Sequence, residues 1–233
     1  SNHTLVMING IPINDQSSTQ GLHDFGVDFI HTIQQIEIYP GSSGTHFGTN
    51  AIGGAINIIL TGDYKDSLNF ISDINSNYEL AVNKNYVYDN SALNLKFGTL
   101  KNKVTSARGK VDDEKDGVKN YSTNLNFEKY LNNNNKLFNT IYFRKTNSEY
   151  DNSNTNQTGY EMDNKMGSFQ LGLENSAQNF LNKYQFYFNA YDREYNERGT
   201  IDTYESNSVG LKLDASRSIE DIFSIGFGTE YKY

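Results

Sequence analysis

The residues of this chain that could do chemistry lie in three places: scattered histidines, one acidic cluster and one polar loop. The histidines are separated by 20, 8 and 15 residues, and they are His3, His23, His31 and His46. A metal centre needs ligands that converge, and these spacings match no compact metal motif. We therefore interpret the histidines as hydrogen-bonded polar residues.

The acidic cluster is a group of carboxylates close together in the sequence, Asp112, Asp113, Glu114 and Asp116. Crowded carboxylate oxygens are ligands that Ca²⁺ prefers, so Asp112, Asp113 and Asp116 are a candidate calcium site. A solvated acidic loop is the simpler interpretation, because such charge runs are usually exposed interaction or solvated segments. No other cofactor is predicted.

The polar loop runs from Asn14 to Asp24, reads NDQSSTQGLHD and has no hydrophobic periodicity. Functional residues are often found in loops that a rigid scaffold holds, and these side chains offer many hydrogen-bonding groups. They are the candidate substrate-binding residues: Asn14, Asp15, Gln16, Ser17, Ser18, Thr19, Gln20, His23 and Asp24. The alternative is an ordinary solvated loop.

The sequence offers no catalytic motif. It contains no Gly-x-Ser-x-Gly nucleophile elbow and no Gly-x-x-x-x-Gly-Lys phosphate loop, so the chain is not expected to be an enzyme. The glycines between positions 41 and 54 do not flank a long helix, which excludes a dinucleotide-binding turn. We expect them to form turns and close backbone approaches, in particular Gly41, Gly48, Gly53 and Gly54.

Composition excludes several classes of protein. The net charge of −8 and the pI of about 5.0 argue against nucleic acid, which binds basic surfaces. The chain has no cysteine, which excludes disulfides and thiolate metal sites. An aromatic content of 13% argues against disorder. No run of about 18 apolar residues is present, so no transmembrane helix is predicted.

Residues 1–62 read as part of a compact mixed α+β domain. The run Leu5–Ile13 (LVMINGIPI) places Asn-Gly between two apolar segments, which is a strong signal for a type I′ turn between strands. Further strands are expected at Ile33–Tyr39 and Ala55–Leu60. Single helical turns are expected at Val27–Thr32 and Thr45–Phe47.

Residues 63–233 show persistent period-two alternation of apolar and polar residues, which is typical of β-strands. Nine segments have this pattern: 66–75, 87–99, 103–111, 119–131, 136–148, 165–176, 180–192, 204–217 and 222–233. Each is near the ~9–11 residues of a strand that crosses a bilayer.

The connections between these segments alternate in length. Short connections are expected at 100–102, 132–135, 178–179 and 218–221, and long ones at 76–86, 112–118, 149–164 and 194–203. Short turns at one rim and long loops at the other are typical of a transmembrane antiparallel β-barrel. The alternatives are a soluble all-β binding or adhesion module, whose strands also alternate, and a passive porin.

Four stretches resemble the second half of the plug domain of TonB-dependent outer-membrane receptors. They are Leu5–Ile13 (LVMINGIPI), Ile33–Ile38 (IQQIEI), Phe47-Gly48 and Ala51–Ile59 (AIGGAINII). Two positions depart from the family pattern. Its usual Arg-Gly-Pro is Pro40-Gly41-Ser42 here, and a later serine of the motif is Gly44.

The resemblance implies an outer-membrane active transporter of a Gram-negative-type bacterium that imports a scarce nutrient. The cargo would be a ferric siderophore or cobalamin, and the energy would come from the partner protein TonB. The resemblance also implies that the loop Asn14–Asp24 rises toward the outer face and contacts the substrate. Since the family barrel has 22 strands, nine strands would be less than half, and we expect an internal fragment.

Overall fold

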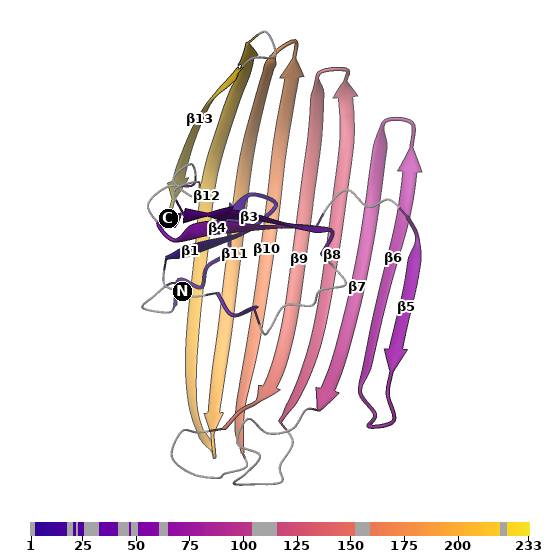
Figure 1. The fold of residues 1–233 in the computed structure, drawn as a ribbon, viewed down its shortest axis with the longest axis vertical. Helices are drawn as coiled ribbons and strands as arrows, with labels where there is room; N and C mark the ends of the chain where they lie inside the picture. The colour runs from indigo at the N-terminus through magenta and orange to yellow at the C-terminus, as the bar shows by residue number, and fades with distance from the viewer. Residues whose placement is uncertain are drawn as a thin grey trace.

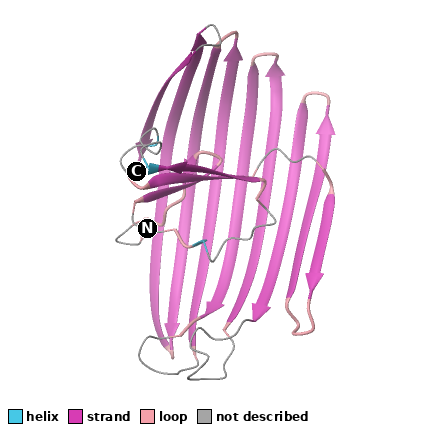
Figure 2. Ribbon diagram, viewed as in Figure 1, coloured by secondary structure: helices cyan, strands magenta, loops and turns pink. Residues whose placement is uncertain are grey.

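The structure is a computed structural model that describes residues 3–17, 21, 23–25, 33–41, 47, 51–60, 65–103, 116–151, 159–219 and 223–233. Within these residues the regular structure is almost entirely strand, as Figure 2 shows. The strands form two sheets, a four-stranded plug sheet and a nine-stranded sheet that we call the wall. In Figure 1 the plug sheet lies across one face of the wall.

The plug sheet has the strand order β2-β1-β4-β3. Its strands are β1 (Thr4–Ile8), β2 (Ile11–Pro12), β3 (Gln35–Pro40) and β4 (Gly54–Ile59). The first and fourth strands run parallel, and the other pairs are antiparallel. Asn9 and Gly10 both have positive φ, 49° and 83°, as the two central residues of a type I′ turn require. The turn predicted between these strands is therefore confirmed.

Two adjacent glycines allow the plug backbone to pack closely at the start of β4. Gly54 has a φ of +122°, and a Cβ there would lie 2.5 Å from the carbonyl oxygen of Tyr39. Gly53 donates its N–H to the carbonyl oxygen of His3 at 2.7 Å. A side chain at Gly54 would thus collide with backbone, and a Cβ on Gly53 would lie in tight contact, 3.0 Å from the carbonyl oxygen of His3. Gly41 has a φ of +53°, whereas Gly48 lies outside the described residues.

The wall consists of nine strands in sequence order, each antiparallel to the next. They are β5 (Ser67–Ser72), β6 (Tyr78–Tyr88), β7 (Ser91–Lys103), β8 (Gly117–Asn132), β9 (Asn135–Glu149), β10 (Tyr160–Ala177), β11 (Phe180–Glu197), β12 (Thr200–Ile219) and β13 (Phe223–Lys232). The long antiparallel strands confirm the predicted architecture. The helical turns predicted at Val27–Thr32 and Thr45–Phe47 lie outside the described residues, apart from Phe47.

Several predicted boundaries are wrong. The segment 87–99 is not one strand, because a turn at Asp89 and Asn90 separates β6 from β7. The predicted connection 76–86 lies mostly within β6, and 100–102 lies within β7. The predicted long connection 194–203 contains only the turn Arg198-Gly199. The polar residues that suggested loops lie on strands, because one face of this sheet is polar. Beyond Lys103, the predicted strand 103–111 lies outside the described residues.

The two ends of the wall differ, as predicted. Two-residue turns join strands at 89–90, 133–134 and 178–179, and we call this the turn end. At the opposite end, which we call the loop end, residues 73–77, 104–116 and 150–159 separate successive strands. The turn Arg198-Gly199 also lies at the loop end and is the short exception.

The two faces of the wall differ in chemistry. The inner face, which the plug sheet covers, carries buried polar side chains such as Asn124, Gln170 and Asn189. The alternate positions face outward and expose large apolar side chains such as Phe143 and Phe188, at 47% and 42%. This inversion, polar inside and apolar outside, is the arrangement of a strand wall that faces lipid.

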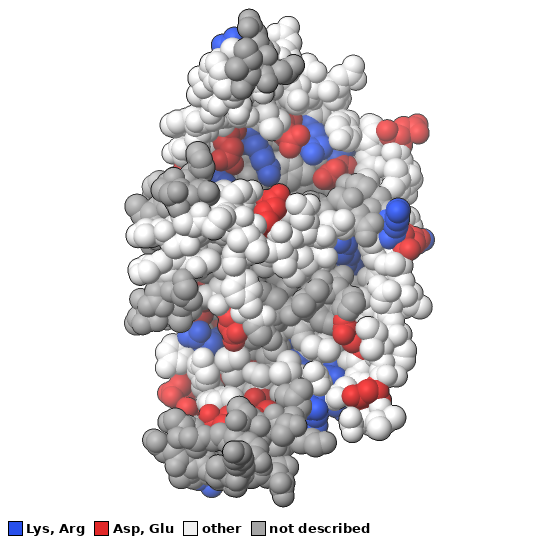
Figure 3. All heavy atoms as spheres, in the orientation of Figure 1, with Lys and Arg blue, Asp and Glu red and all other residues white. Residues whose placement is uncertain are grey.

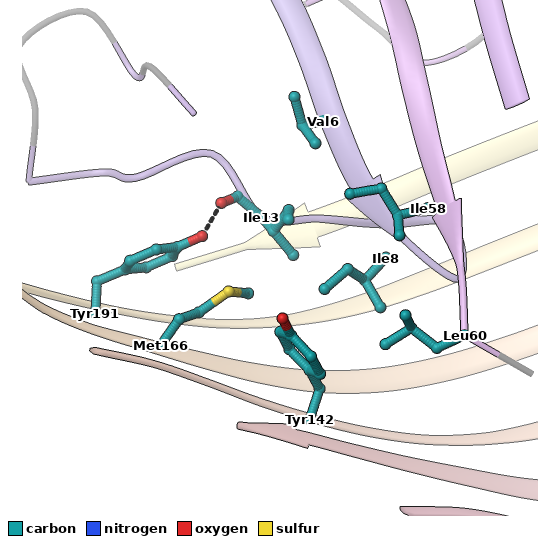
Figure 4. Close-up of a cluster of buried hydrophobic side chains, with 8 residues drawn as sticks. All are labelled: Val6, Ile8, Ile13, Ile58, Leu60, Tyr142, Met166 and Tyr191. Carbon is teal, nitrogen blue, oxygen red and sulfur yellow. Dashed lines mark hydrogen bonds between the residues drawn. The ribbon is translucent and has the colours of Figure 1, made fainter. Parts of the chain in front are cut away.

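A small apolar core joins the plug to the wall. From the plug it contains Val6, Ile8, Ile13, Ile58 and Leu60, and from the wall Tyr142, Met166 and Tyr191. Figure 4 shows the wall side chains pointing up into the plug group, with the Tyr191 hydroxyl donating to the carbonyl oxygen of Ile13. Apolar packing thus fixes the plug against the wall at one place.

Strand register places a row of alternating charges across the inner face near the turn end. Lys136 lies opposite Glu174, Glu174 opposite Lys183, and Lys183 opposite Asp214. The ammonium group of Lys136 is 3.5 Å from the Glu174 carboxylate. Figure 3 shows acidic and basic side chains side by side in the hollow above the plug sheet. A cavity of about 720 Å³ opens there between the plug and strands β11–β13.

Two aromatic rings lie over glycines on the neighbouring strand. Tyr187 pairs with Gly210, and a Cβ on that glycine would lie 2.4 Å from the ring. Phe138 covers Gly172 in the same way, at 2.1 Å. A ring that fills the space above a cross-strand glycine restores the packing that the glycine lacks and pins the register of the two strands.

We expect Gly210→Val to destabilise the wall, because the added side chain would displace the fully buried Tyr187 ring. Overpacking of this kind costs about 1–3 kcal/mol. Denaturant unfolding of the protein in detergent micelles measures the effect. Gly167→Val is the matched control, since nothing lies within 4 Å of a Cβ at that position. Equal stability of the two variants would contradict this packing role.

Candidate ligand-binding site

Four tyrosines form a chain of ring contacts at the loop end of the wall. The ring centroids are 5.7 Å apart between Tyr150 and Tyr160, and 6.0 Å apart between Tyr150 and Tyr195. Tyr195 and Tyr204 are also 6.0 Å apart and meet edge to face. Tilted and edge-to-face arrangements at these distances are favourable for aromatic pairs. They create a continuous aromatic surface.

Strand periodicity places these tyrosines on the inner face. Tyr195 follows the inward-facing Tyr191 and Arg193 at steps of two along β11, and Tyr204 lies opposite Arg193 on β12. Tyr160 begins β10, and its backbone carbonyl accepts a hydrogen bond from the N–H of Tyr150 at 3.1 Å. Tyr204 is 42% exposed, so part of the aromatic surface is open to a ligand.

Arg193 lies at the deep edge of this surface. Its guanidinium carbon is 5.4 Å from the ring centroid of Tyr195 and 5.2 Å from that of Tyr204, within the range of cation–π attraction. Its Nη1 also donates to a carboxylate oxygen of Asp15 at 2.9 Å. A single side chain therefore contacts the aromatic surface and the plug.

Asp15 ties the polar loop of the plug to the wall. One carboxylate oxygen binds Arg193, and the other accepts hydrogen bonds from the backbone N–H and the hydroxyl of Ser17, at 2.8 and 2.6 Å. The Ser206 hydroxyl approaches the same oxygen at 3.4 Å. The side chains of Asp15 and Arg193 are only 6% and 17% exposed. Removing one partner of a buried pair typically costs about 3–5 kcal/mol.

The side chain of Asn14 forms hydrogen bonds with the backbone of the plug. Its Oδ1 accepts the N–H of Val6 at 2.8 Å, and its Nδ2 donates to the carbonyl oxygens of Thr4 and Gly21 at 3.1 and 2.7 Å. Both amide hydrogens are therefore committed to the plug backbone. These hydrogen bonds hold the polar loop against β1.

The remaining described residues of the polar loop are more accessible. Gln16 is exposed, and its Nε2 donates to the carbonyl oxygen of Asn14 at 2.9 Å. Asp24 is exposed as well, and His23 contacts the ring of Phe25 at 4.9 Å between centroids. The predicted contact residues Ser18, Thr19 and Gln20 lie outside the described residues.

The calcium prediction falls mostly outside the described part of the chain, which contains Asp116 but neither Asp112 nor Asp113. Among the residues that the structure does describe, no three histidine or carboxylate side chains are grouped as metal ligands would be. A search of the same residues for a helix long and apolar enough to cross a membrane found none.

Sequence reasoning did not identify the tyrosines or Arg193 as site residues. Tyr195 lay inside the predicted connection 194–203, and Tyr204 at the edge of the next predicted strand. The alternation of inward-facing and outward-facing residues along each strand could have identified them, since both tyrosines continue the inward-facing positions of their strands. The ion pair of Arg193 with Asp15 joins positions 178 residues apart, and no local pattern predicts it.

The pKa of Tyr150 provides a test of this geometry. Burial, followed by the hydrogen bond to Glu197, raises it from 10.0 to about 12. The phenol donates to the Glu197 carboxylate at 3.1 Å. Because the folded state favours the neutral phenol, this contribution to stability is full below pH 10 and is lost as the pH rises through about 12.

In the wild-type protein, we expect the phenolate absorbance that is lost in Tyr150→Phe to develop near pH 12. Glu197→Gln should shift this absorbance change to lower pH, because the neutral amide no longer repels a phenolate. A difference spectrum that develops at pH 10 in the wild type would show that Tyr150 does not contact Glu197.

Comparison with known proteins gives the plug a family. Residues 1–55 match the family described as TonB-dependent Receptor Plug Domain. The vitamin B12 transporter BtuB of Photobacterium profundum is 46% identical over 59 residues, which are 25% of this chain and 9% of that protein. The chain therefore covers under a tenth of this curated relative in the matched region.

Solved structures match the whole of the described fold. The siderophore receptor PirA from Acinetobacter baumannii is 16% identical, with a TM-score of 0.76 over 99% of this chain and 40% of PirA. The ferric-catecholate import receptor Fiu from E. coli K12 is 12% identical, with a TM-score of 0.74 over 99% of this chain and 42% of Fiu. Residues 1–55 are thus a plug segment of the TonB-dependent receptor family, and the strands that follow have the fold of these receptors' barrels.

Proposed function

We propose that the chain is part of an active transporter in the outer membrane of a Gram-negative-type bacterium. It would bind a scarce nutrient at the outer surface and import it with energy from TonB. The observation that carries this proposal is the aromatic surface of Tyr150, Tyr160, Tyr195 and Tyr204. It lies on the inner face of the wall, at the end beyond the plug.

The orientation follows from the connections. Outer-membrane barrels have short periplasmic turns and longer extracellular loops, so the loop end would face the outside and the turn end the periplasm. The tyrosine surface would then be the first part of the inner face that a ligand meets. The plug, to which residues 1–62 contribute, would lie between that ligand and the periplasm, with 63–233 as the barrel part.

The contacts of the plug argue against a passive porin. Gln170 and Asn189 on the wall donate to carbonyl oxygens of Ile8 and Pro12, at 3.0 and 2.9 Å. Lys212 donates to the carbonyl oxygen of Gly10 at 3.0 Å. A plug held by so many contacts closes the lumen at rest, so passage would require an energy-driven rearrangement. A ligand would drive that change only by binding one plug state more tightly than the other.

The proposed cargo is cobalamin or a ferric siderophore. The similarity of the plug to a vitamin B12 transporter supports the first, and the fold of siderophore receptors supports the same class of uptake system. From the polar loop we propose Gln16, Ser17, His23 and Asp24 as ligand contacts. Asn14 and Asp15 would hold the loop in place, because their side chains already bind the plug and the wall.

Binding of cyanocobalamin and of ferric siderophores to the intact receptor tests the proposal. We expect Tyr195→Ala and Tyr204→Ala each to weaken binding of the preferred ligand by about tenfold, the value of one lost aromatic contact. Tyr121→Ala is the matched control, because this tyrosine faces outward and is 46% exposed. The Tyr121→Ala variant should bind the ligand with the same affinity as the wild type.

Two outcomes would contradict the proposal. Binding of neither ligand class at micromolar concentration would remove the cargo assignment. Ligand binding that all three alanine variants leave unchanged would show that the tyrosine surface is not the binding site.

A further inference from the structure

We infer that Asp15 is a specificity-determining residue that makes this surface select neutral or cationic ligands over polyanionic ones. It does so by neutralising Arg193, the cation that lies against the tyrosine surface. The inference rests on the proposed function, since it concerns the ligand of the same site. A residue of the plug, Asp15, would thus control the charge of a residue of the wall, Arg193.

The contacts of Arg193 support this role. The guanidinium is enclosed by Tyr195, Tyr204 and the carboxylate of Asp15. A guanidinium in this setting would otherwise be a strong anion-binding group, because it offers several donors in a fixed fork. The carboxylate accepts a hydrogen bond from one of these donors, Nη1, from the plug side. A ligand anion that bound Nη1 would have to displace Asp15.

Asp15 is itself held so that it cannot easily turn away. Its second oxygen accepts two hydrogen bonds from Ser17, and its side chain is 6% exposed. A carboxylate fixed by its own loop is a preorganised partner for the arginine. The neutralisation is therefore a property of the plug loop in its resting position.

Acidic side chains occupy strand positions next to the tyrosines. Asp202 lies opposite Tyr195 on the neighbouring strand, and Glu197 lies opposite Tyr160. Arg144, a further inward-facing cation, is 1% exposed and donates to Asn164, so a ligand on the tyrosine surface would not contact it directly. Figure 3 shows acidic side chains near the loop end. The carboxylates of Asp202 and Glu197 thus add negative charge beside the tyrosines.

The chemistry that suits such a surface is a conjugated or macrocyclic ligand without excess negative charge. Tyrosine faces attract apolar rings and cations, and carboxylates repel anions. A corrinoid or an uncharged ferric hydroxamate would stack without penalty. A trianionic ferric tricatecholate would meet like charges in a site of low dielectric.

The test uses the intact receptor and two probes, cyanocobalamin, which is uncharged overall, and ferric enterobactin, a trianion. Asp15→Asn keeps the shape of the side chain and removes the charge that neutralises Arg193. Asp202→Asn is the matched control, because it removes one negative charge from the same surface without removing the arginine's partner. The double variant D15N/R193Q removes both members of the pair.

We expect the wild type to bind cyanocobalamin more tightly than ferric enterobactin. Asp15→Asn should raise the affinity for ferric enterobactin relative to that for cyanocobalamin by about tenfold, the effect of a charge-assisted hydrogen bond. The ratio is compared because a loosened loop would weaken both ligands alike. Asp202→Asn should give only a few-fold gain from the general change in charge. In D15N/R193Q the tenfold gain should disappear, because it requires the freed guanidinium.

The inference is overturned if the wild type prefers the trianion, a measurement that does not depend on any variant folding. It is also overturned if Asp15→Asn weakens both ligands equally, which would indicate a structural role only. Either result leaves the proposed function intact as long as the tyrosine variants lose affinity. Failure of the tyrosine variants to lose affinity would instead reject the site itself.

Discussion

The structure depends on side-chain donors of the wall that bind backbone carbonyls of the plug. The hairpin of β1 and β2 ends against the wall, and side chains of the inner face reach its carbonyl oxygens. Gln170, Asn189 and Lys212 donate to Ile8, Pro12 and Gly10. Asn124 and Asn126 both donate to Leu60, each at 3.2 Å. A buried carbonyl left without a donor costs about 1–3 kcal/mol.

This requirement explains the unusual composition of the chain. A mean hydropathy of −0.67 is low for a protein with so much buried surface, and the reason is that the buried face of the wall is amide-rich. The apolar core shared with the plug is small by comparison. Some buried polar atoms of the inner face, such as Ser168 Oγ and Asn189 Oδ1, have no hydrogen-bond partner among the described residues, and such positions suit bound water. A polar interface can exchange protein contacts for water, so the contact between plug and wall depends little on a large apolar core.

The sequence predicted the architecture because period-two alternation and plug motifs are local signals. The turn at Asn9-Gly10 and the long antiparallel strands were found in this way. Strand ends were placed poorly, since polarity marks a loop in most proteins but marks the inner face here, as in β6. Asp15 lies in the predicted polar loop, yet its partner could not be predicted, because Arg193 meets it only through the tertiary fold. Similarly, Tyr195 and Tyr204 form a surface only because strands β11 and β12 continue as far as the turn at Arg198, where a long connection was expected.

The charge row near the turn end favours the observed register of strands β11 and β12 over a register shifted by two residues. Most buried polar side chains of the inner face are asparagine, serine or threonine, which can also pair after a slip of two residues, a shift that keeps every side chain on its own face. The row does not tolerate that slip. Moving β12 by two residues in one direction would place Lys212, instead of Asp214, opposite Lys183, and like charges directly opposite each other are destabilising. The same slip would put Ser208 beneath the Tyr187 ring in place of Gly210. Charge and fit thus disfavour this slip of β12 against β11.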